Sequence, residues 1–136
     1  DNAAQYKGWK ILLVDDDPIL RKLGSRVLLQ EKMEPSLAVD GFDALKKTEV
    51  QKYDLILVDH FMPGMDGVTL FQEIRKQKKN QATPVAMLTA DDEKDAADQY
   101  CKMGFTGYIS KPLNHEKLQK LLNVIPAENR EAGTHE

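Results

Sequence analysis

The sequence predicts a doubly wound α/β fold, in which a five-stranded parallel sheet carries helices on both faces. Strands that are buried on both faces, as in a parallel sheet, consist of short and continuously apolar runs. Four such runs end in polar residues: Ile11–Val14, Leu55–Val58, Val85–Leu88 and the shorter Tyr108–Ser110. Amphipathic segments separate the runs, and a strand–helix alternation repeated five times is typical of this fold class.

The first half of the chain provides two strands and two helices. Pro18 suits the first position of a helix, and the apolar residues that follow it recur at helical spacing: Ile19, Leu20, Leu23, Val27 and Leu28. A weaker strand is expected at residues 36–39. A helix is expected at residues 41–51, where the apolar stripe is poorer: Phe42, Leu45 and Val50.

The second half repeats the alternation after a strand that ends at Asp59. Residues 62–67 are dense in turn formers, and Val68, Phe71 and Ile74 then indicate a helix that fades in residues 76–81. The next helix is expected to open with Asp91, Asp92 and Glu93, whose charges suit a helix N-terminus. A short strand follows Gly104 and Gly107, and a last helix carries Leu118, Leu121, Leu122 and Ile125.

Length and composition indicate one globular domain. The chain has 136 residues, with 41% apolar and 30% charged residues, which is enough to bury a core. We expect the domain at residues 9–126, an N-terminal tail at 1–8, and a C-terminal tail or linker at 127–136, because the end segments are polar and lack periodicity. Trp9 is expected to pack at an edge of the domain.

Charge and cysteine content exclude several function classes. A net charge of -3 argues against direct nucleic-acid binding by this segment, which requires a basic face. No apolar run approaches the roughly 18 residues of a membrane span, so we expect no membrane insertion. Cys101 is the only cysteine, so no disulfide forms within the chain, which is typical of cytoplasmic proteins. The first residue is not methionine, which favours a piece of a larger protein over a stand-alone regulator.

The residues at the strand ends predict a polar site. Asp59 follows the third strand, Thr89 the fourth and Lys111 the fifth, and ligands of parallel sheets bind outside these carboxyl ends. The strand order 2-1-3-4-5 places the first and third strands side by side, so Asp15 and Asp16 are expected to converge on Asp59. Three like charges so close are unfavourable unless a cation or a proton joins them, and a set of oxygen ligands suits Mg²⁺.

Each of these residues also has an ordinary structural interpretation. Asp17, which precedes Pro18, is better interpreted as a helix cap than as a site residue. Thr89 alone could cap the following helix, and Tyr108 alone could belong to the core. The matching positions of all these residues at strand ends favour a phosphoryl-transfer site.

Five motifs, in order, make the sequence resemble the receiver domains of two-component response regulators, which have the chemotaxis-regulator-like (flavodoxin-like) fold. The resemblance extends roughly from residue 10 to residue 124. Each motif alone is weak, but together they are highly specific: Val14-Asp15-Asp16, Val58-Asp59 with Met62–Gly67, Thr89-Ala90, Tyr108, and Lys111-Pro112.

The resemblance implies a phosphorylation-dependent switch in a phosphorelay. Asp59 would accept a phosphoryl group from a sensor histidine kinase or a histidine phosphotransfer protein. Mg²⁺ (or Mn²⁺) would be bound by Asp16, Asp59 and the backbone carbonyl of Phe61, and by Asp15 through a water molecule. The domain would catalyse only its own phosphorylation and dephosphorylation, so it is not expected to be an enzyme.

The resemblance also assigns the residues of the switch. Lys111 would pair with Asp59 at rest and with the phosphoryl oxygens afterwards, and the Lys111–Pro112 bond would be cis. Thr89 would move its hydroxyl onto the phosphoryl group, and Tyr108 would follow into the vacated space. The partner-binding surface would then change over the last two helices and the fifth strand. The resemblance does not identify the downstream effector.

The sequence departs from the family pattern near the site. Phe61 places an apolar ring where the family often has a polar side chain, and Asp91 could orient or repel the hydrolytic water. His60 is interpreted as a surface residue, with a role in tuning the site as the less favoured alternative. The lifetime of the phosphorylated state is therefore left open.

Two other function classes fit parts of the sequence. Residues 11–19 nearly supply the opening motif of a haloacid-dehalogenase-type phosphatase, with Asp15 as nucleophile and Asp17 as general acid. That family needs a late acidic pair after its lysine, where this chain has only Asn114, His115 and Glu116. A degenerate receiver that serves only as an interaction module is the third class, and the presence of every site residue argues against it.

Overall fold

Five strands and five helices alternate in the part of the chain that the structure describes. The computed structural model describes residues 6–90 and 94–125. The strands are β1 (Lys10–Val14), β2 (Glu34–Ala38), β3 (Leu55–Asp59), β4 (Val85–Thr89) and β5 (Gly107–Ser110). The helices are α1 (Pro18–Gln30), α2 (Gly41–Val50), α3 (Gly67–Arg75), α4 (Lys94–Met103) and α5 (His115–Asn123).

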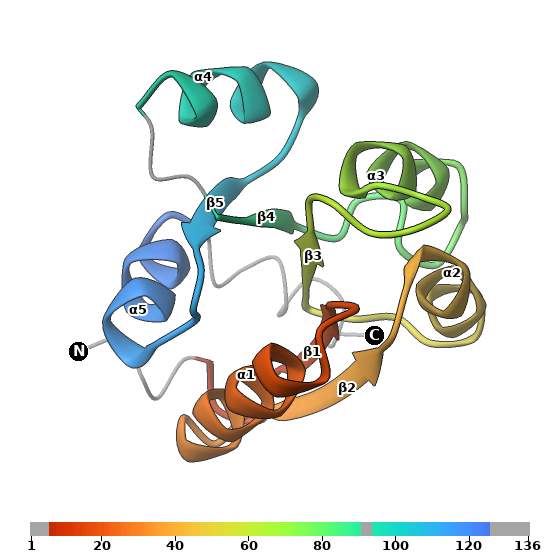
Figure 1. Ribbon diagram of the computed structural model, residues 1–136. Coiled ribbons are helices and arrows are strands. Elements are labelled where there is room, and N and C mark those ends of the chain that lie inside the picture. The colour runs from red at the N-terminus through yellow and green to blue at the C-terminus, as the bar shows by residue number, and fades with distance from the viewer. Residues whose placement is uncertain (1–5, 91–93, 126–136) are drawn as a thin grey trace.

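The strands form one parallel sheet in the order β2-β1-β3-β4-β5 (Figure 1), which confirms the predicted topology. In the register of β1 and β3, Val14 lies opposite Val58, so the residues that follow the two strands come out at the same edge. The sheet therefore brings the acidic segment after β1 next to Asp59, the last residue of β3.

Alternate residues of β1, β3 and β4 enter two separate hydrophobic cores. Ile11 and Leu13 belong to the core that contains residues of α1 and α5, whereas Leu12 and Val14 belong to the core that contains residues of α2, α3 and α4. The helices accordingly cover both faces of the sheet (Figure 1). This two-sided burial explains why the strands are continuously apolar rather than alternating. None of the described helices has the length and apolar character to cross a lipid bilayer.

Helix α1 forms where the apolar spacing predicts it, but its buried face is shifted away from Ile19 and Leu23. Ile19 is 69% exposed and Leu23 is 42% exposed, whereas Gly24 and Leu28 are buried. A Cβ atom on Gly24 would lie 2.7 Å from Leu13 Cδ2, so the helix packs too closely against β1 for a larger side chain there. Glycine therefore marks the contact line, and a stripe of large apolar residues alone does not locate it.

Three further expectations are modified by the structure. Strand β2 begins at Glu34 rather than residue 36 and includes Pro35, which an edge strand tolerates because its outer side needs no ladder hydrogen bond. Helix α2 ends one residue before the expected position, at Val50. The expected acidic start of the fourth helix, residues 91–93, lies outside the described residues.

The N-terminal segment contributes to the core on the α5 side of the sheet. Trp9 was expected at an edge, but it is fully buried, and its ring lies edge-on to that of Tyr6 at 4.6 Å. The Tyr6 hydroxyl donates to the backbone oxygens of Leu122 and Ile125, at 2.7 and 2.8 Å. The packed part of the domain therefore includes at least Tyr6, which the sequence assigned to a tail.

Polar side chains define where four of the helices begin. Each accepts a hydrogen bond from a backbone N–H of the first turn, which satisfies one of the unpaired donors at a helix N-terminus. These N-cap residues are Asp17, Asp40, Asp66 and Asn114. In Asp17 this is the capping role that the sequence favours, and it accepts from the N–H groups of Ile19 and Leu20.

Candidate functional site

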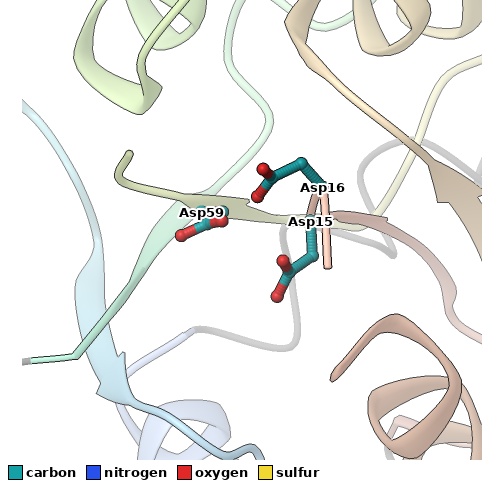
Figure 2. A group of neighbouring side chains, drawn as sticks. All are labelled: Asp15, Asp16 and Asp59. Atoms are coloured by element: carbon teal, nitrogen blue, oxygen red, sulfur yellow. The ribbon is translucent and has the colours of Figure 1, made fainter. Parts of the chain in front are cut away.

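Three carboxylates gather at the edge of the sheet where β1 and β3 end. One oxygen from each of Asp15, Asp16 and Asp59 lies within 4.8 Å of the others. Figure 2 shows Asp15 and Asp16 beyond the end of β1 and Asp59 beside them at the end of β3. Asp15 and Asp59 are each 2% exposed, whereas Asp16 is exposed to solvent. The cluster is thus open to solvent on the side of Asp16.

The positions within the cluster are fixed by the local backbone. Asp15 Oδ1 accepts a hydrogen bond from the N–H of Asp17 at 2.9 Å, which holds the carboxylate against the start of α1. The Arg21 guanidinium donates to the backbone oxygen of Asp15 at 2.7 Å. Asp17 caps α1 and is not part of the cluster, so its carboxylate serves the start of the helix.

The electrostatics of the cluster oppose full ionisation. Burial raises the pKa of the Asp59 carboxyl; the hydrogen bond with Lys111 opposes this effect, and the charge of Asp15 adds to it. The pKa of Asp16 is also raised, by burial first and then by its hydrogen bond to Asp59 and the like charge there. Neighbouring carboxylates with raised pKa values are stabilised when one of them takes up a proton or when a cation binds between them.

Lys111 brings one positive charge to Asp59. Its Nζ lies 2.6 Å from Asp59 Oδ1, and the two side chains are 21% and 3% exposed. The backbone N–H of Lys111 donates to the backbone oxygen of Thr89 at 2.8 Å, so the end of β4 holds the main chain of Lys111 in place. The Lys111–Pro112 peptide bond is cis, as the resemblance implied.

Thr89 and Tyr108 lie on the two strands beyond β3. Thr89 ends β4, is 3% exposed, and lies opposite Ser110 of β5. Tyr108 lies opposite Met87 and is partly buried against the core on the α4 side. Its ring is 6.2 Å from that of Tyr100 on α4. These two residues extend the site from Asp59 across the sheet towards α4.

The loop between β3 and α3 begins directly after Asp59. Phe61 is 73% exposed, and its ring stacks on that of His60 at 4.0 Å. The loop ends at Gly67, where a Cβ atom would lie 2.6 Å from the backbone oxygen of Asp59. Only glycine allows α3 to begin so close to the end of β3.

Sequence patterns did not indicate one contact beside the site. Tyr100 Oη lies 3.1 Å from His60 Nδ1, although His60 was interpreted as a surface residue and Tyr100 was not singled out. The two residues are 40 positions apart, and no motif connects them. Asp91, which was named as a possible influence on the hydrolytic water, lies outside the described residues.

The comparisons with known proteins decide the family. A family model described as the response regulator receiver domain matches residues 11–123. The chain belongs to this family. Receiver domains serve two-component systems as phosphorylation-dependent switches, and the family is one of signalling domains rather than enzymes.

Similar proteins include a transcriptional regulator that is longer than this chain and a chemotaxis protein that the match covers almost completely. The transcriptional regulatory protein ResD of Bacillus subtilis is 40% identical over 105 residues, which cover 77% of this chain and 42% of ResD. The structure of the Vibrio cholerae chemotaxis protein CheY4 has a TM-score of 0.79 at 33% identity, over 88% of this chain and 99% of CheY4. The chain spans 12% to 56% of the length of the first four curated relatives that it matches.

A receiver domain with a bound metal is also similar. The receiver domain of a sensor histidine kinase from Pseudomonas aeruginosa has a magnesium ion coordinated in its active-site cleft. It has a TM-score of 0.76 at 31% identity, and the match covers 87% of the present chain and 97% of the Pseudomonas chain.

Proposed function

We propose that Asp59 is the phosphoacceptor of this receiver domain and that it takes its phosphoryl group from a phosphohistidine on a sensor histidine kinase or a histidine phosphotransfer protein. A carboxylate oxygen of Asp59 would form the new P–O bond while the P–N bond of the phosphohistidine breaks and the leaving imidazole nitrogen takes up a proton. The observation that carries this proposal is the convergence of Asp15, Asp16 and Asp59 beside the Lys111 ammonium.

The donor set fits Mg²⁺ or Mn²⁺. It consists of carboxylate oxygens, two of the three carboxylates are buried, and the pKa values of Asp16 and Asp59 are raised, so a divalent cation would relieve an unfavourable accumulation of charge. We assign Asp16, Asp59 and the backbone carbonyl of Phe61 as direct ligands and Asp15 as a ligand through water. The cation supplies positive charge that neutralises the transferring phosphoryl oxygens.

The remaining residues act on the same phosphoryl group. Lys111 would move from the Asp59 carboxylate to a phosphoryl oxygen, which keeps its charge beside the group as negative charge develops. The Thr89 hydroxyl would donate to another phosphoryl oxygen, and Tyr108 would then shift inwards. Dephosphorylation, catalysed by the same residues, would return the domain to rest.

Two exposed surfaces are proposed for partners. Ile19 and Phe61, at 69% and 73% exposure, follow the acidic segments at the ends of β1 and β3 and offer apolar contacts to the phosphodonor protein. The effector would bind over α4, β5 and α5, where an open concavity of about 450 Å³ is lined by residues that include Tyr108, Lys117 and Val124. A change at Tyr108 would alter this surface directly.

Labelling with acetyl phosphate tests the phosphoacceptor. In the presence of Mg²⁺ we expect one phosphoryl group per chain, mapped to Asp59, and no labelling in Asp59→Asn or after removal of Mg²⁺ with a chelator. Asp98→Asn, which changes an exposed carboxylate on α4, is the matched control and should label like the wild type. A label on Asp15 would support the phosphatase class instead, and failure of the wild type to label would support an interaction module.

A further inference from the structure

The loop that follows Asp59 is connected to α4 by a side-chain hydrogen bond. Tyr100 Oη lies 3.1 Å from His60 Nδ1, and the two rings meet edge-on with centroids 5.7 Å apart. Tyr100 is only 5% exposed and belongs to the hydrophobic core on that face of the sheet. Its hydroxyl is therefore held in a fixed place, and it contacts the residue directly after Asp59.

His60 is held from three sides. Its N–H donates to the backbone oxygen of Leu88 at 3.0 Å, and its own backbone oxygen accepts from the N–H of Gly67 at 2.8 Å. These bonds attach the main chain to β4 and to the start of α3. The hydrogen bond with Tyr100 then fixes the imidazole, which the main-chain bonds leave free to rotate about its side-chain torsions.

The fixed imidazole supports the next residue. The Phe61 ring stacks on His60 with centroids 4.0 Å apart and an interplanar angle of 22°. Because Phe61 is 73% exposed, this stacked neighbour restrains a side chain that otherwise faces solvent. The backbone carbonyl of Phe61 belongs to the peptide group between Phe61 and Met62, directly after the two stacked rings. A restraint on the Phe61 side chain therefore acts on the residue whose own backbone torsion orients this carbonyl.

We propose that Tyr100 is a positioning residue for the phosphoacceptor loop, because its hydroxyl, through His60, holds Phe61 and the backbone carbonyl of Phe61 in the orientation used for metal binding. This inference rests on the proposed function, which assigns that carbonyl to the cation. A ligand that is already oriented loses less conformational freedom when the metal binds, and the contacts behind a ligand commonly set metal affinity for this reason.

Tyr100→Phe isolates the hydroxyl. Phenylalanine retains the ring contacts of Tyr100 with Phe105 and Tyr108, at 5.8 and 6.2 Å, and removes only the bond to His60. We expect the Mg²⁺ dissociation constant, measured by titration calorimetry with Mg²⁺ alone, to rise about twofold to tenfold, the range of one net hydrogen bond. The rate of labelling by acetyl phosphate at subsaturating Mg²⁺ should fall by a similar factor and recover at saturating Mg²⁺.

A matched control separates positioning from stability. Tyr53→Phe removes a hydroxyl from another buried tyrosine of the same core, just before the start of β3 and away from Asp59. This variant should leave the Mg²⁺ dissociation constant at the wild-type value, whatever it does to thermal stability. Measurements below the unfolding transition of every variant ensure that only folded protein is titrated.

Changes at His60 test whether Tyr100 acts through it. Asparagine places an amide close to the position of Nδ1, so His60→Asn should retain more Mg²⁺ affinity than His60→Leu. In the double variant Tyr100→Phe with His60→Leu, the loss should not exceed that of His60→Leu alone, because the bond is already absent.

The outcomes discriminate between this proposal and the one on which it rests. Wild-type Mg²⁺ affinity in Tyr100→Phe, or additive losses in the double variant, would overturn the positioning role and leave the phosphoacceptor assignment intact. If the wild type bound no Mg²⁺ and was not labelled at Asp59, the proposed function would fail, and the positioning role with it.

Discussion

At the scale of single residues, the carboxylates of the site differ in whether a positive charge lies beside them. Asp59 has a direct partner in Lys111. The pKa of Asp16 is raised by burial first, and then by its hydrogen bond to Asp59 and the like charge there. Phosphorylation would replace one carboxylate charge by about -1.5 to -2 charges and three acceptor oxygens. A new donor on one of these oxygens is therefore a natural readout of the modification, and Thr89 ends the neighbouring strand at this edge.

Thr89→Ala tests that readout. A hydrogen bond to a charged acceptor is worth about 1.5–3 kcal/mol net, or roughly a ten- to 150-fold bias, whereas a change from 1:99 to 99:1 needs about 5.5 kcal/mol. We therefore expect Thr89→Ala to be labelled at Asp59 but to show smaller phosphorylation-dependent NMR shift changes over β5 and α5, and weaker phosphorylation-dependent binding of an effector.

Thr83→Ala is the appropriate comparison for this variant. Thr83 is 1% exposed and precedes β4, where its hydroxyl bonds the backbone oxygen of Tyr53 and the Asn80 side chain. Its loss should reduce stability without reducing the shift changes. Shift changes of wild-type size in Thr89→Ala would show that the threonine does not carry the signal.

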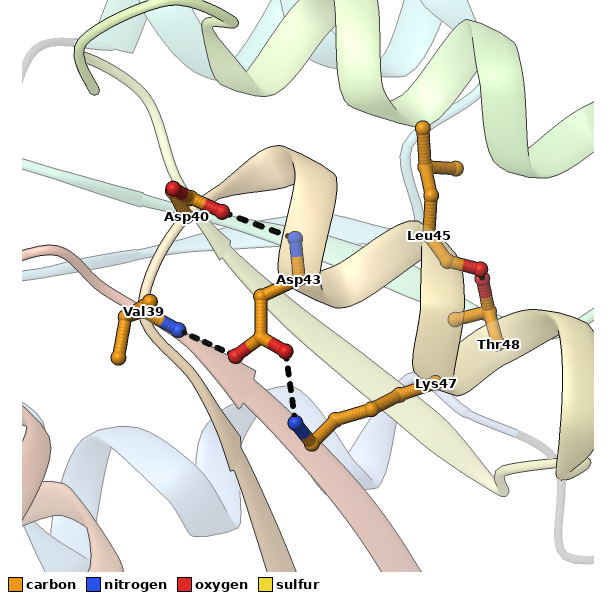
Figure 3. Close-up of polar contacts among 6 residues, drawn as sticks. All are labelled: Val39, Asp40, Asp43, Leu45, Lys47 and Thr48. Carbon is orange, nitrogen blue, oxygen red and sulfur yellow. Dashed lines mark hydrogen bonds and ion pairs between the residues drawn. The ribbon is translucent and has the colours of Figure 1, made fainter.

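At the scale of elements, the helices on the α2 side depend on polar contacts at their first turn. Asp43 in α2 accepts from the N–H of Val39 at 3.0 Å and from Lys47 Nζ at 2.8 Å, while its own N–H donates to Asp40 (Figure 3). The hydrogen bond with Lys47, opposed by burial, holds the pKa of Asp43 below its ordinary value of 3.8. One carboxylate thus joins the end of β2 to the first turns of α2.

Asp43→Asn should lower stability in a pH-dependent way. Because the pKa is lowered in the folded state, the stabilisation is complete above pH 3.8 and is lost as pH falls through the folded-state pKa. The Asp43 and Lys47 side chains are 29% and 37% exposed, so solvent screening limits the loss at neutral pH to about 0.5–1 kcal/mol. Urea unfolding from neutral pH to below pH 3.8 should show the difference from wild type shrinking, with Asp98→Asn as control. A constant difference would contradict the assignment.

The sequence predicted the helices and strands better than it predicted which face of a helix is buried. Apolar runs predicted β1, β3 and β4 clearly, because burial on both faces leaves a continuous signal. The signal for β2 was weaker, and α4 was expected from acidic residues at its start rather than from an apolar run. In α1 the same logic misplaced Ile19 and Leu23, since contact with the sheet is made where Gly24 permits close approach. Tyr6 was missed for a related reason, because a lone apolar residue in a polar segment has no periodicity.

The site was predictable to the extent that it is built from strand ends. Parallel strands carry their last residues to one edge, so Asp15, Asp16 and Asp59 could be placed together before any coordinates were known. The contact of Tyr100 with His60 depends on how α4 lies over the sheet, and no local pattern encodes that orientation. Motifs therefore indicate the chemistry of the site, whereas tertiary packing determines how its loops are held.

At the scale of the whole molecule, the carboxylate cluster links metal binding to folding. The raised pKa values of Asp16 and Asp59 mean that the folded protein binds protons more readily than the unfolded chain, so the cluster destabilises the fold at neutral pH and stops doing so below about pH 3.8. The domain therefore retains an unfavourable charge cluster at rest. A cation that binds only the folded state would reverse this effect.

Asp16→Asn should change the stability of the apo and the Mg²⁺-bound protein in opposite directions. Without Mg²⁺ at neutral pH, we expect the free energy of unfolding of the variant to equal or exceed that of the wild type. The increase should be less than about 1 kcal/mol, because Asp16 is exposed. With Mg²⁺ at 100 times the dissociation constant, the wild type should gain about 2.7 kcal/mol, and the variant should lose most of this gain. Chemical unfolding at matched ionic strength measures both, since screening alone also weakens repulsion. An equal Mg²⁺ gain in both proteins would remove Asp16 from the metal site, because a ligand stabilises the fold only through contacts that the folded state provides.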